Sequence, residues 1–447
     1  MIDPELAQQA VRLALEDGAT DAECTLAEGD EFSAVVRMRS LEKLIDAGSR
    51  SAGLRVLIGQ RAGSSYTSDL SHEGIRKMVE SALAVAQIAT DDPYAGLPDA
   101  ADLGAIPGDL QLYSNDLDAI DTAARIRAAL ETEEAAFAAD SRITNSDGAS
   151  FSAGARARVF ANSRGFAGAY RYTSCSLSTT PVARQGDSME RDYWFSSARS
   201  HSKLETPSAI GRRAAERTVR RLGSRKVPTQ KVPVIFDPLT ARSLIANIFE
   251  AVEGDAIYRN ASFLAGKVGE RVASQHVTII DDGTIPGLFG TSPFDDEGVP
   301  SRRTVVIDRG LLQSYLLNTY TARKLGLRTT GNAARGVTGN AGVGHGNFYL
   351  ENGPRSPEEL IRGVRQGLYV TELIGQGVNI VTGDYSRGAA GLWIENGEFA
   401  YPVSEITIAS TLQRMLLDLE APASDLEFRG SVAAPTLLIG EMTVSGQ

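Results

Sequence analysis

The sequence predicts an α+β protein, with an N-terminal region of helices and antiparallel sheet followed by a mainly β C-terminal domain. In the first half, segments with apolar residues at helical spacing are separated by short runs in which apolar and polar residues alternate. Beyond residue 232 the chain is rich in glycine and in short apolar runs bounded by turn residues. With 447 residues it is long enough for two or three domains, each with its own core.

The first predicted region, residues 1–92, opens with a helix. Asp3 and Pro4 form an N-cap and first-turn pair, and helical spacing of apolar residues follows them. Short runs separated by Gly, Asp and Ser then predict an antiparallel meander over residues 22–67. A second helix is expected at 71–89.

The second predicted region, residues 110–225, repeats this order of helix and meander. It follows residues 91–109, which are rich in Pro and Asp and predict an exposed connection between subdomains. A helix is expected at 117–139, and strands at 142–195, where Ser, Thr, Ala and aromatic residues alternate. A further helix starts at Thr206, which is followed by a proline.

One face of this last helix is basic. The four arginines on it are Arg213, Arg217, Arg220 and Arg221. A basic stripe contacts an acidic partner or, more commonly, faces solvent. We interpret it as a solvated helix face and assign it no chemistry.

The third predicted region, residues 230–447, contains the mainly β domain. Apolar, β-branched runs predict strands at 277–280, 304–307 and 378–381. Asp237 and the proline after it predict the start of a helix. An apolar stripe places one face of that helix in the core, and its residues are Leu244, Ile245, Ile248, Phe249 and Val252.

Composition limits the partners. The chain has 45 Lys and Arg against 56 Asp and Glu, and a formal charge of −11 opposes attraction to nucleic acid or anionic membranes. No apolar run approaches the ~20 residues of a membrane span. Cys24 and Cys175 are far apart and form no CxxC pair, which argues against a disulfide framework or a thiolate zinc cage. We therefore expect a cytoplasmic protein.

Several motifs of the third region are distinctive. Glu-Gly-Asp stands at 253–255, and Ile-Asp-Asp-Gly-Thr follows at 280–284. Gly-Asp-Tyr-Ser-Arg-Gly occupies 383–388, Gly-Leu-Trp-Ile-Glu-Asn-Gly occupies 391–397, and Tyr-Pro-Val occupies 401–403. In these motifs the chain resembles the TldD/PmbA metalloprotease family, specifically its TldE (PmbA) branch, which lacks the zinc motif.

The resemblance implies where a zinc site would stand. The metal-bearing subunit of that family has His-Glu-x-x-x-His just before Glu-Gly-Asp, and here those positions hold Ile245, Ala246 and Glu250. Ile245 cannot bind a metal, Ala246 cannot transfer a proton, and Glu250 offers a single carboxylate. The implied third ligand is a C-terminal Cys, which the segment 430–437 lacks. We predict no catalytic residue and no metal in this chain, and zinc in a partner subunit.

A glycine-rich loop at 330–346 predicts the substrate-binding residues. Glycines let an extended peptide approach a backbone and pair with it as an added strand. The residues predicted to bind substrate are Asn332, Gly342, Gly344 and His345. A phosphate cradle is an alternative, although no Gly-Lys-Ser/Thr follows.

Two other sites are weaker alternatives. His345 lies near Ser and Asp residues, but the Gly-x-Ser-x-Gly elbow of many serine hydrolases is absent from the sequence. Glu250, Glu253 and Asp255 stand close together and would bind a hard cation weakly, although clustered acids at a helix end more often face water.

The resemblance implies a function in proteolysis or maturation of unfolded peptides. The chain would be the non-catalytic subunit of a heterodimeric TldD/TldE-type zinc metalloprotease, inactive alone and paired with a TldD-like zinc-bearing subunit. The family also has an older name, modulator of DNA gyrase, but no residue here indicates a gyrase contact. A homodimeric peptide-binding protein without protease activity is the alternative, and an independent hydrolase is a third.

Overall fold

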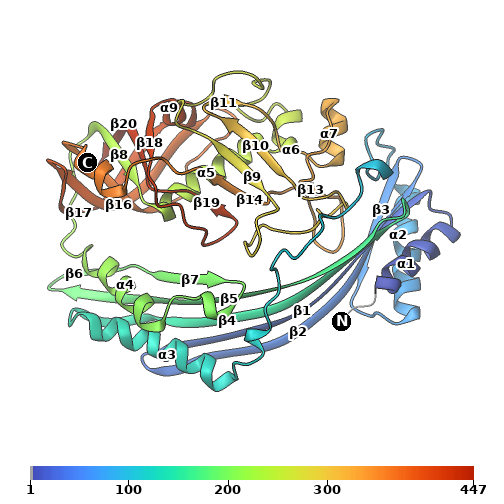
Figure 1. Cartoon of the computed structure of the whole chain (residues 1–447), viewed down its shortest axis with the longest axis horizontal. Helices are drawn as coiled ribbons and strands as arrows, with labels where there is room; N and C mark the ends of the chain where they lie inside the picture. Colours follow the sequence, from blue (N-terminus) through green and yellow to red (C-terminus); the bar gives the residue numbers. More distant parts are fainter. Residues whose placement is uncertain (1–3, 447) are drawn as a thin grey trace.

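The computed structural model describes residues 4–446, and Figure 1 labels its helices and strands. A seven-stranded antiparallel sheet runs through the N-terminal half, in the order β3-β2-β1-β4-β5-β6, with β7 paired to β5. Its strands are β1 (Asp21–Arg37), β2 (Ser40–Ile58), β3 (Arg61–Thr67), β4 (Ile143–Asn162), β5 (Ala167–Gln185), β6 (Ser188–Arg191) and β7 (Trp194–Ala198). The antiparallel meanders predicted from the alternating runs are confirmed.

The first two predicted regions contribute to this one sheet. Strand β1 of the first region pairs with β4 of the second along most of its length, from Glu23 opposite Asn162 to Val36 opposite Ala149. The sequence had not predicted this pairing, because the two strands are separated by more than a hundred residues and no local pattern links them.

Helices cover the convex side of the curved sheet (Figure 1). At one end lie α1 (Pro4–Glu16) and α2 (His72–Ile88), and at the other α3 (Thr122–Ala139) and α4 (Pro207–Val219). Ser71 and Thr206 cap α2 and α4 through their side-chain oxygens, as expected of hydroxyl residues before a helix. The predicted cap Asp3 lies outside the described residues. Helix α3 begins later than predicted, because residues 115–117 form a 3-10 turn.

The two faces of the long strands differ in chemistry. Because side chains alternate along a strand, one face of β4 and β5 is apolar and packs in the core with residues of α3 and α4. The residues of that apolar face are Phe151, Ala153, Cys175 and Leu177. The opposite face is small and polar, and its serines are Ser150, Ser152, Ser174, Ser176 and Ser178. The concave side of the sheet turns toward the C-terminal domain (Figure 1), and the serine-rich face lies on that side, because Ser152 and Ser174 line the same cavity as Phe289 and Arg429.

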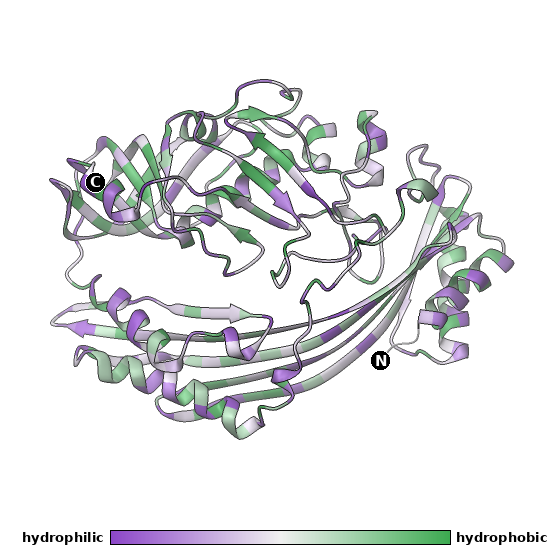
Figure 2. Ribbon diagram, viewed as in Figure 1, coloured by the Kyte–Doolittle hydropathy of each residue, from purple (hydrophilic) through white to green (hydrophobic). Residues whose placement is uncertain are grey.

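Two larger sheets form the C-terminal domain. One has the order β17-β16-β15-β8-β20-β18, and β17 also pairs with β20, which closes the sheet into a ring. The other has the order β11-β10-β9-β14-β19, and β12 pairs with β13. Hydrophobic residues fill many of these strands (Figure 2). Their bounds are β8 (Gln230–Phe236), β9 (Ile279–Asp282), β10 (Arg303–Asp308), β11 (Leu311–Leu312), β12 (Ala333–Ala334), β13 (Gly342–Val343), β14 (Asn347–Leu350), β15 (Gln366–Ile374), β16 (Asp384–Glu395), β17 (Glu398–Thr411), β18 (Leu419–Pro422), β19 (Val432–Ala433) and β20 (Leu437–Ser445).

One longer helix, α5 (Pro238–Val252), and several short ones complete this domain, which confirms the mainly β prediction. The short ones are α6 (Gly254–Tyr258), α7 (Thr319–Leu325), α8 (Pro357–Arg362) and α9 (Leu412–Leu417). Between residues 4 and 446, helices long and apolar enough to cross a membrane are absent.

The predicted strand at 378–381 is wrong. Only Val378 forms an isolated bridge, to Tyr385. The side chain of Asn379 accepts a hydrogen bond from the backbone N–H of Val381 at 2.9 Å, and its carbonyl accepts one from Gly383 at 2.7 Å. This asparagine-centred turn competes with the β-propensity of its neighbours and prevails.

The connection at 91–109 is also more than an exposed linker. Leu97 is 1% exposed, and its carbonyl accepts a hydrogen bond from Arg323 Nη2 at 2.7 Å. The backbone N–H of Gly104 bonds the carbonyl of Gly298 at 3.0 Å. The segment packs against the C-terminal domain. These backbone N–H and C=O groups are hydrogen-bonded to that domain, and such bonds require no periodicity in the sequence.

Candidate functional site

Helix α5 holds the positions of the missing zinc motif. It starts, as predicted, after Asp237, whose Oδ1 accepts a hydrogen bond from the backbone N–H of Thr240 at 2.8 Å. Ile245 is fully buried in the core of the C-terminal domain, Ala246 is half-buried, and Glu250 is exposed. The helix therefore keeps its packing role and offers no ligand at the first two positions.

The donor chemistry here does not fit a zinc ion. Strand β19, in the C-terminal segment where the third ligand was expected, packs against α5 and carries only Val432 and Ala433. Within residues 4–446, a cluster of three or more His, Cys, Asp or Glu side chains that could hold a metal is absent. Structural and catalytic zinc sites need at least three such ligands.

Four cavities lie between the N-terminal sheet and the C-terminal domain. Their volumes are about 820, 300, 360 and 430 Å³. The 820 and 300 Å³ cavities share Arg429, the 300 and 360 Å³ cavities share Arg156 and Ser174, and the 430 Å³ cavity shares Arg242 with the largest. Shared walls of this kind define one interdomain cleft, with volumes in the range of ligand sites.

Three of the four residues predicted to bind substrate line the 360 Å³ cavity. They are Asn332, Gly344 and His345. Asn332 is 5% exposed and donates from Nδ2 to Asp281 at 2.7 Å. His345 packs edge-on against Phe249 of α5, with ring centroids 4.6 Å apart, and burial lowers its pKa.

Gly342 does not line that cavity. It lies in β13, opposite Ala334, and its carbonyl accepts a hydrogen bond from Asn318 Nδ2 at 3.1 Å. Its role in substrate binding stays a prediction, and its backbone is held by protein partners.

The glycine-rich loop docks on the N-terminal sheet. A Cβ at Gly53 of β2 would lie 1.5 Å from the carbonyl oxygen of Val337, so the two backbones approach as only glycine permits. Arg55 Nε donates to Asn340 Oδ1 at 2.9 Å. The loop thus bridges the two halves of the molecule, in addition to contributing Asn332, Gly344 and His345 to the cavity.

Buried carboxyls in the same cavity were missed by the sequence analysis. Asp281 follows two buried isoleucines within β9 and is 3% exposed, and burial raises the pKa of its carboxyl to about 7. Burial and the nearby Glu297 also raise the pKa of Asp295, which is 7% exposed. The available signal was a pair of acids directly after an apolar, β-branched run. Carboxyls of this kind cluster at functional sites.

Asp281→Asn is expected to weaken the pH dependence of stability. The folded-state pKa lies above the unfolded value of about 3.9, so the folded chain binds the extra proton between about pH 4 and 7. Stability from this group is therefore lost as the pH rises through that window. Urea unfolding from pH 5 to 8 should show a slope shallower in the variant by up to about 1.4 kcal/mol per pH unit. Parallel slopes for the two proteins would contradict the assignment.

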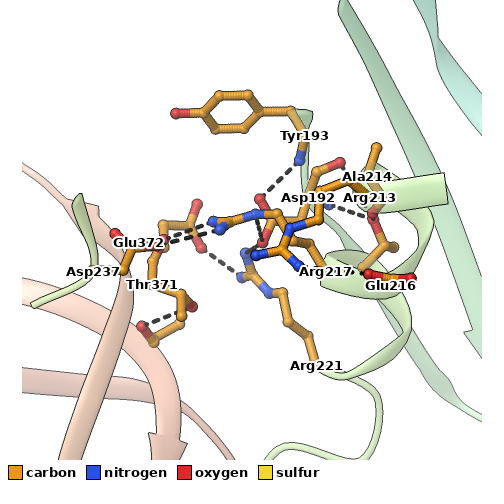
Figure 3. Close-up of polar contacts among 12 residues, drawn as sticks. Asp192, Tyr193, Arg213, Ala214, Glu216, Arg217, Arg221, Asp237, Thr371 and Glu372 are labelled. Atoms are coloured by element: carbon orange, nitrogen blue, oxygen red, sulfur yellow. Dashed lines mark hydrogen bonds and ion pairs between the residues drawn. The ribbon is translucent and has the colours of Figure 1, made fainter. Parts of the chain in front are cut away.

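The interpretation of the four arginines as a solvated face is wrong for Arg217, Arg220 and Arg221, whereas the Arg213 side chain is 54% exposed. The Arg217 side chain is 4% exposed, with Nε 3.3 Å from Asp192 Oδ2 and Nη1 3.2 Å from Asp237 Oδ2. Figure 3 shows these groups converging between α4 and the C-terminal domain. Arg221 continues the network toward Glu372. Helical spacing revealed the shared face but not the domain that covers it.

Comparisons with known proteins agree with this architecture. Family models described as PmbA/TldA metallopeptidase domain 1, central domain and C-terminal domain match residues 22–86, 115–222 and 229–446. The chain is 37% identical over 438 residues to the metalloprotease PmbA homolog of Haemophilus influenzae, covering 98% of this chain and 94% of the relative. The chain belongs to the PmbA/TldD metallopeptidase family. PmbA is the TldE branch, as the motifs indicated.

Within the PmbA/TldD family, the TldD branch is more distant. The metalloprotease TldD homolog of Haemophilus influenzae is 25% identical over 427 residues, covering 89% of this chain and 87% of the relative. The crystal structure of a candidate modulator of DNA gyrase from Bacteroides thetaiotaomicron superposes with a TM-score of 0.92 at 28% identity, covering 99% of this chain and 98% of that one. The older gyrase-related name thus also accompanies this fold.

Proposed function

We propose that the chain is a non-catalytic subunit of a heterodimeric TldD/TldE-type zinc metalloprotease in the cytoplasm, acting on unfolded peptides. The observation that carries the proposal is α5, where Ile245 is fully buried and Ala246 replaces the residue that would act as base. A chain with this helix supplies neither the metal nor the proton transfer of a zinc protease. Zinc and catalysis then belong to a TldD-like partner.

The interdomain cleft supports a role in handling peptide. Its floor is the serine-rich concave face of β4 and β5, whose short side chains leave room for an extended chain. A zinc ion enclosed between two subunits acts only on segments that reach it unfolded, because a folded domain cannot enter a narrow chamber. The second subunit would thereby contribute selectivity.

Zinc analysis before and after complex formation tests this proposal. The purified chain should contain no stoichiometric zinc, whereas the complex with its His-Glu-x-x-x-His homologue should contain about one zinc per pair. The complex should cleave an unfolded peptide, and chelation should abolish cleavage. A complex in which the partner's motif glutamate is replaced by glutamine is the matched control and should be inactive while keeping its zinc.

Two results would oppose the proposal in different ways. Stoichiometric zinc and chelator-sensitive cleavage by the chain alone would contradict it. A stable homodimer that binds peptide but neither binds nor activates the zinc-bearing homologue would favour the peptide-binding alternative.

A further inference from the structure

The 820 Å³ cavity is a second polar site, distinct from the cavity around Asn332. It lies among α4, the start of α5, β7 and β19. Six arginines and six carboxylates line it, so its formal charge is balanced. Its ligand preference therefore depends on which of these groups are already paired.

The lining carboxylates largely have partners within the protein. Glu205 and Glu427 both pair with Arg429, each at 2.8 Å. Asp237 pairs with Arg217, and Glu216 lies 3.7 Å from Arg213. Asp425 accepts hydrogen bonds from the backbone N–H and the hydroxyl of Thr436, each at 2.8 Å. Glu358 belongs to the exposed first turn of α8.

Arg212, Arg220 and Arg242 have no carboxylate within ion-pair distance in residues 4–446, and of these three Arg220 is the one with buried donor atoms that lack hydrogen-bond partners. These atoms are its Nε and Nη2. Burial and the neighbouring Arg217 lower its pKa. A desolvated guanidinium without partners is costly, and its third nitrogen, Nη1, is neither among these buried atoms nor hydrogen-bonded in residues 4–446, so Nη1 is the donor that an anion in the cavity would reach.

The rest of the wall is aromatic and apolar. Trp194 stacks under the guanidinium of Arg429, with 4.3 Å between Cζ and the ring centroid. Leu239, Ile361 and Phe399 complete a surface that suits a hydrophobic side chain. Arg242 has no carboxylate partner in residues 4–446 and lies over Phe195, beside the same space.

We infer that this cavity binds a carboxylate of an apolar peptide, with Arg220 Nη1 donating to the carboxylate and the neighbouring side chain lying on the Trp194 wall. A guanidinium forms a charge-assisted hydrogen bond with a carboxylate, which is stronger than a bond between neutral groups. Inorganic phosphate would use the same donor but leave the apolar wall uncovered. The inference rests on the proposed handling of peptides and adds a chemical preference to it.

Trp194 makes the site directly observable. The chain has two tryptophans, and the other, Trp393, is 1% exposed in the C-terminal core. Ligand binding in the cavity should therefore change the emission of Trp194, and Trp194→Phe should remove that signal. Calorimetry with the same ligands provides a measurement that does not depend on the tryptophan.

Three acetylated peptides test the preference on the full chain. Acetyl-Ala-Leu-Phe with a free carboxylate should bind at least about tenfold more tightly than its C-terminal amide. Acetyl-Ala-Glu-Phe amide distinguishes a side-chain carboxylate from a terminal one. Arg220→Gln should lower the affinity for each carboxylate peptide to that for acetyl-Ala-Leu-Phe amide. The affinity for that neutral amide should not change. Arg127→Gln, at an exposed arginine of α3, is the matched charge control and should change nothing.

Several outcomes would overturn the inference. These are equal affinities of the free acid and both amides, an acid preference that survives Arg220→Gln, or displacement by inorganic phosphate at lower concentration than by the acid peptide. The ligand comparison on the wild-type chain decides the matter even if Arg220→Gln unfolds. The proposed function is tested separately, by the zinc content of the complex and by its cleavage of an amidated peptide. The carboxylate site and the proposed function can therefore be refuted independently.

Discussion

Arg217→Met is expected to lower the free energy of unfolding by about 3–5 kcal/mol. The substitution removes a guanidinium that lies between two buried carboxylates, Asp192 and Asp237, whose side chains are 3% and 4% exposed. It also removes a hydrogen bond from Nη2 to the carbonyl of Thr371 at 3.3 Å. Asp237 would then be left desolvated without a counter-ion, and Asp192 would keep only Arg221, whose Nη1 is 3.9 Å away.

The effect should extend to the start of α5. Burial raises the pKa of Asp237, and Arg217 opposes that rise. Without Arg217, Asp237 takes up a proton more readily and becomes a weaker cap for the backbone N–H of Thr240. The helix that carries the altered zinc motif and the packing between the two halves of the chain therefore depend on the same ion cluster.

Urea unfolding measures this effect, and the neighbouring arginine is a matched control. Arg213 is 54% exposed and pairs with Glu216, which is 66% exposed. Exposed pairs contribute at most about 1 kcal/mol, so Arg213→Met should be nearly neutral. Adding Asp192→Asn and Asp237→Asn to Arg217→Met should recover part of the loss by removing the two buried negative charges. Equal effects of Arg213→Met and Arg217→Met would refute the cluster's role.

Local signals in the sequence predicted where helices begin. Thr206 and Asp237 each precede a proline, and the structure places both as N-caps with their side-chain oxygens bonded to the first turn. A cap and a first-turn proline act on neighbouring residues only. The start of such a helix can therefore be predicted from the local sequence alone. Alternation along 142–195 predicted strands for the same reason, because it encodes two faces of different chemistry.

Contacts distant in sequence were not predictable in this way. The burial of Arg217 depends on a domain that begins after α4, and the pairing of β1 with β4 joins separate regions. At the candidate site, the glycine loop and His345 were identified by composition, whereas Asp281 and Asp295 were not. Their altered titration arises from burial between segments that meet only in the folded chain.

Arg335→Met is expected to cost about 3 kcal/mol and to release the glycine-rich loop from the N-terminal sheet. Arg335 Nη1 pairs with Glu23 of β1, and the two side chains are 3% and 2% exposed. Arg335 Nη2 also donates to the carbonyl of Asp296 at 3.1 Å. Glu23 keeps a second partner, Arg55, at 2.9 Å. The decrease in the free energy of unfolding should therefore lie at the lower end of the range for breaking a buried ion pair.

Hydrogen exchange distinguishes this local release from general destabilisation. Amides of residues 333–343 should exchange faster in Arg335→Met, while amides in the C-terminal core change only as far as global stability falls. Arg328→Met is the control, because its pair with Asp102 is on the surface, with the Arg328 side chain 86% exposed. A double-mutant cycle with Glu23→Gln should give a coupling well above 0.5 kcal/mol. Additive effects would show that the loop is held by the close approach of Gly53 and Val337 and not by this ion pair.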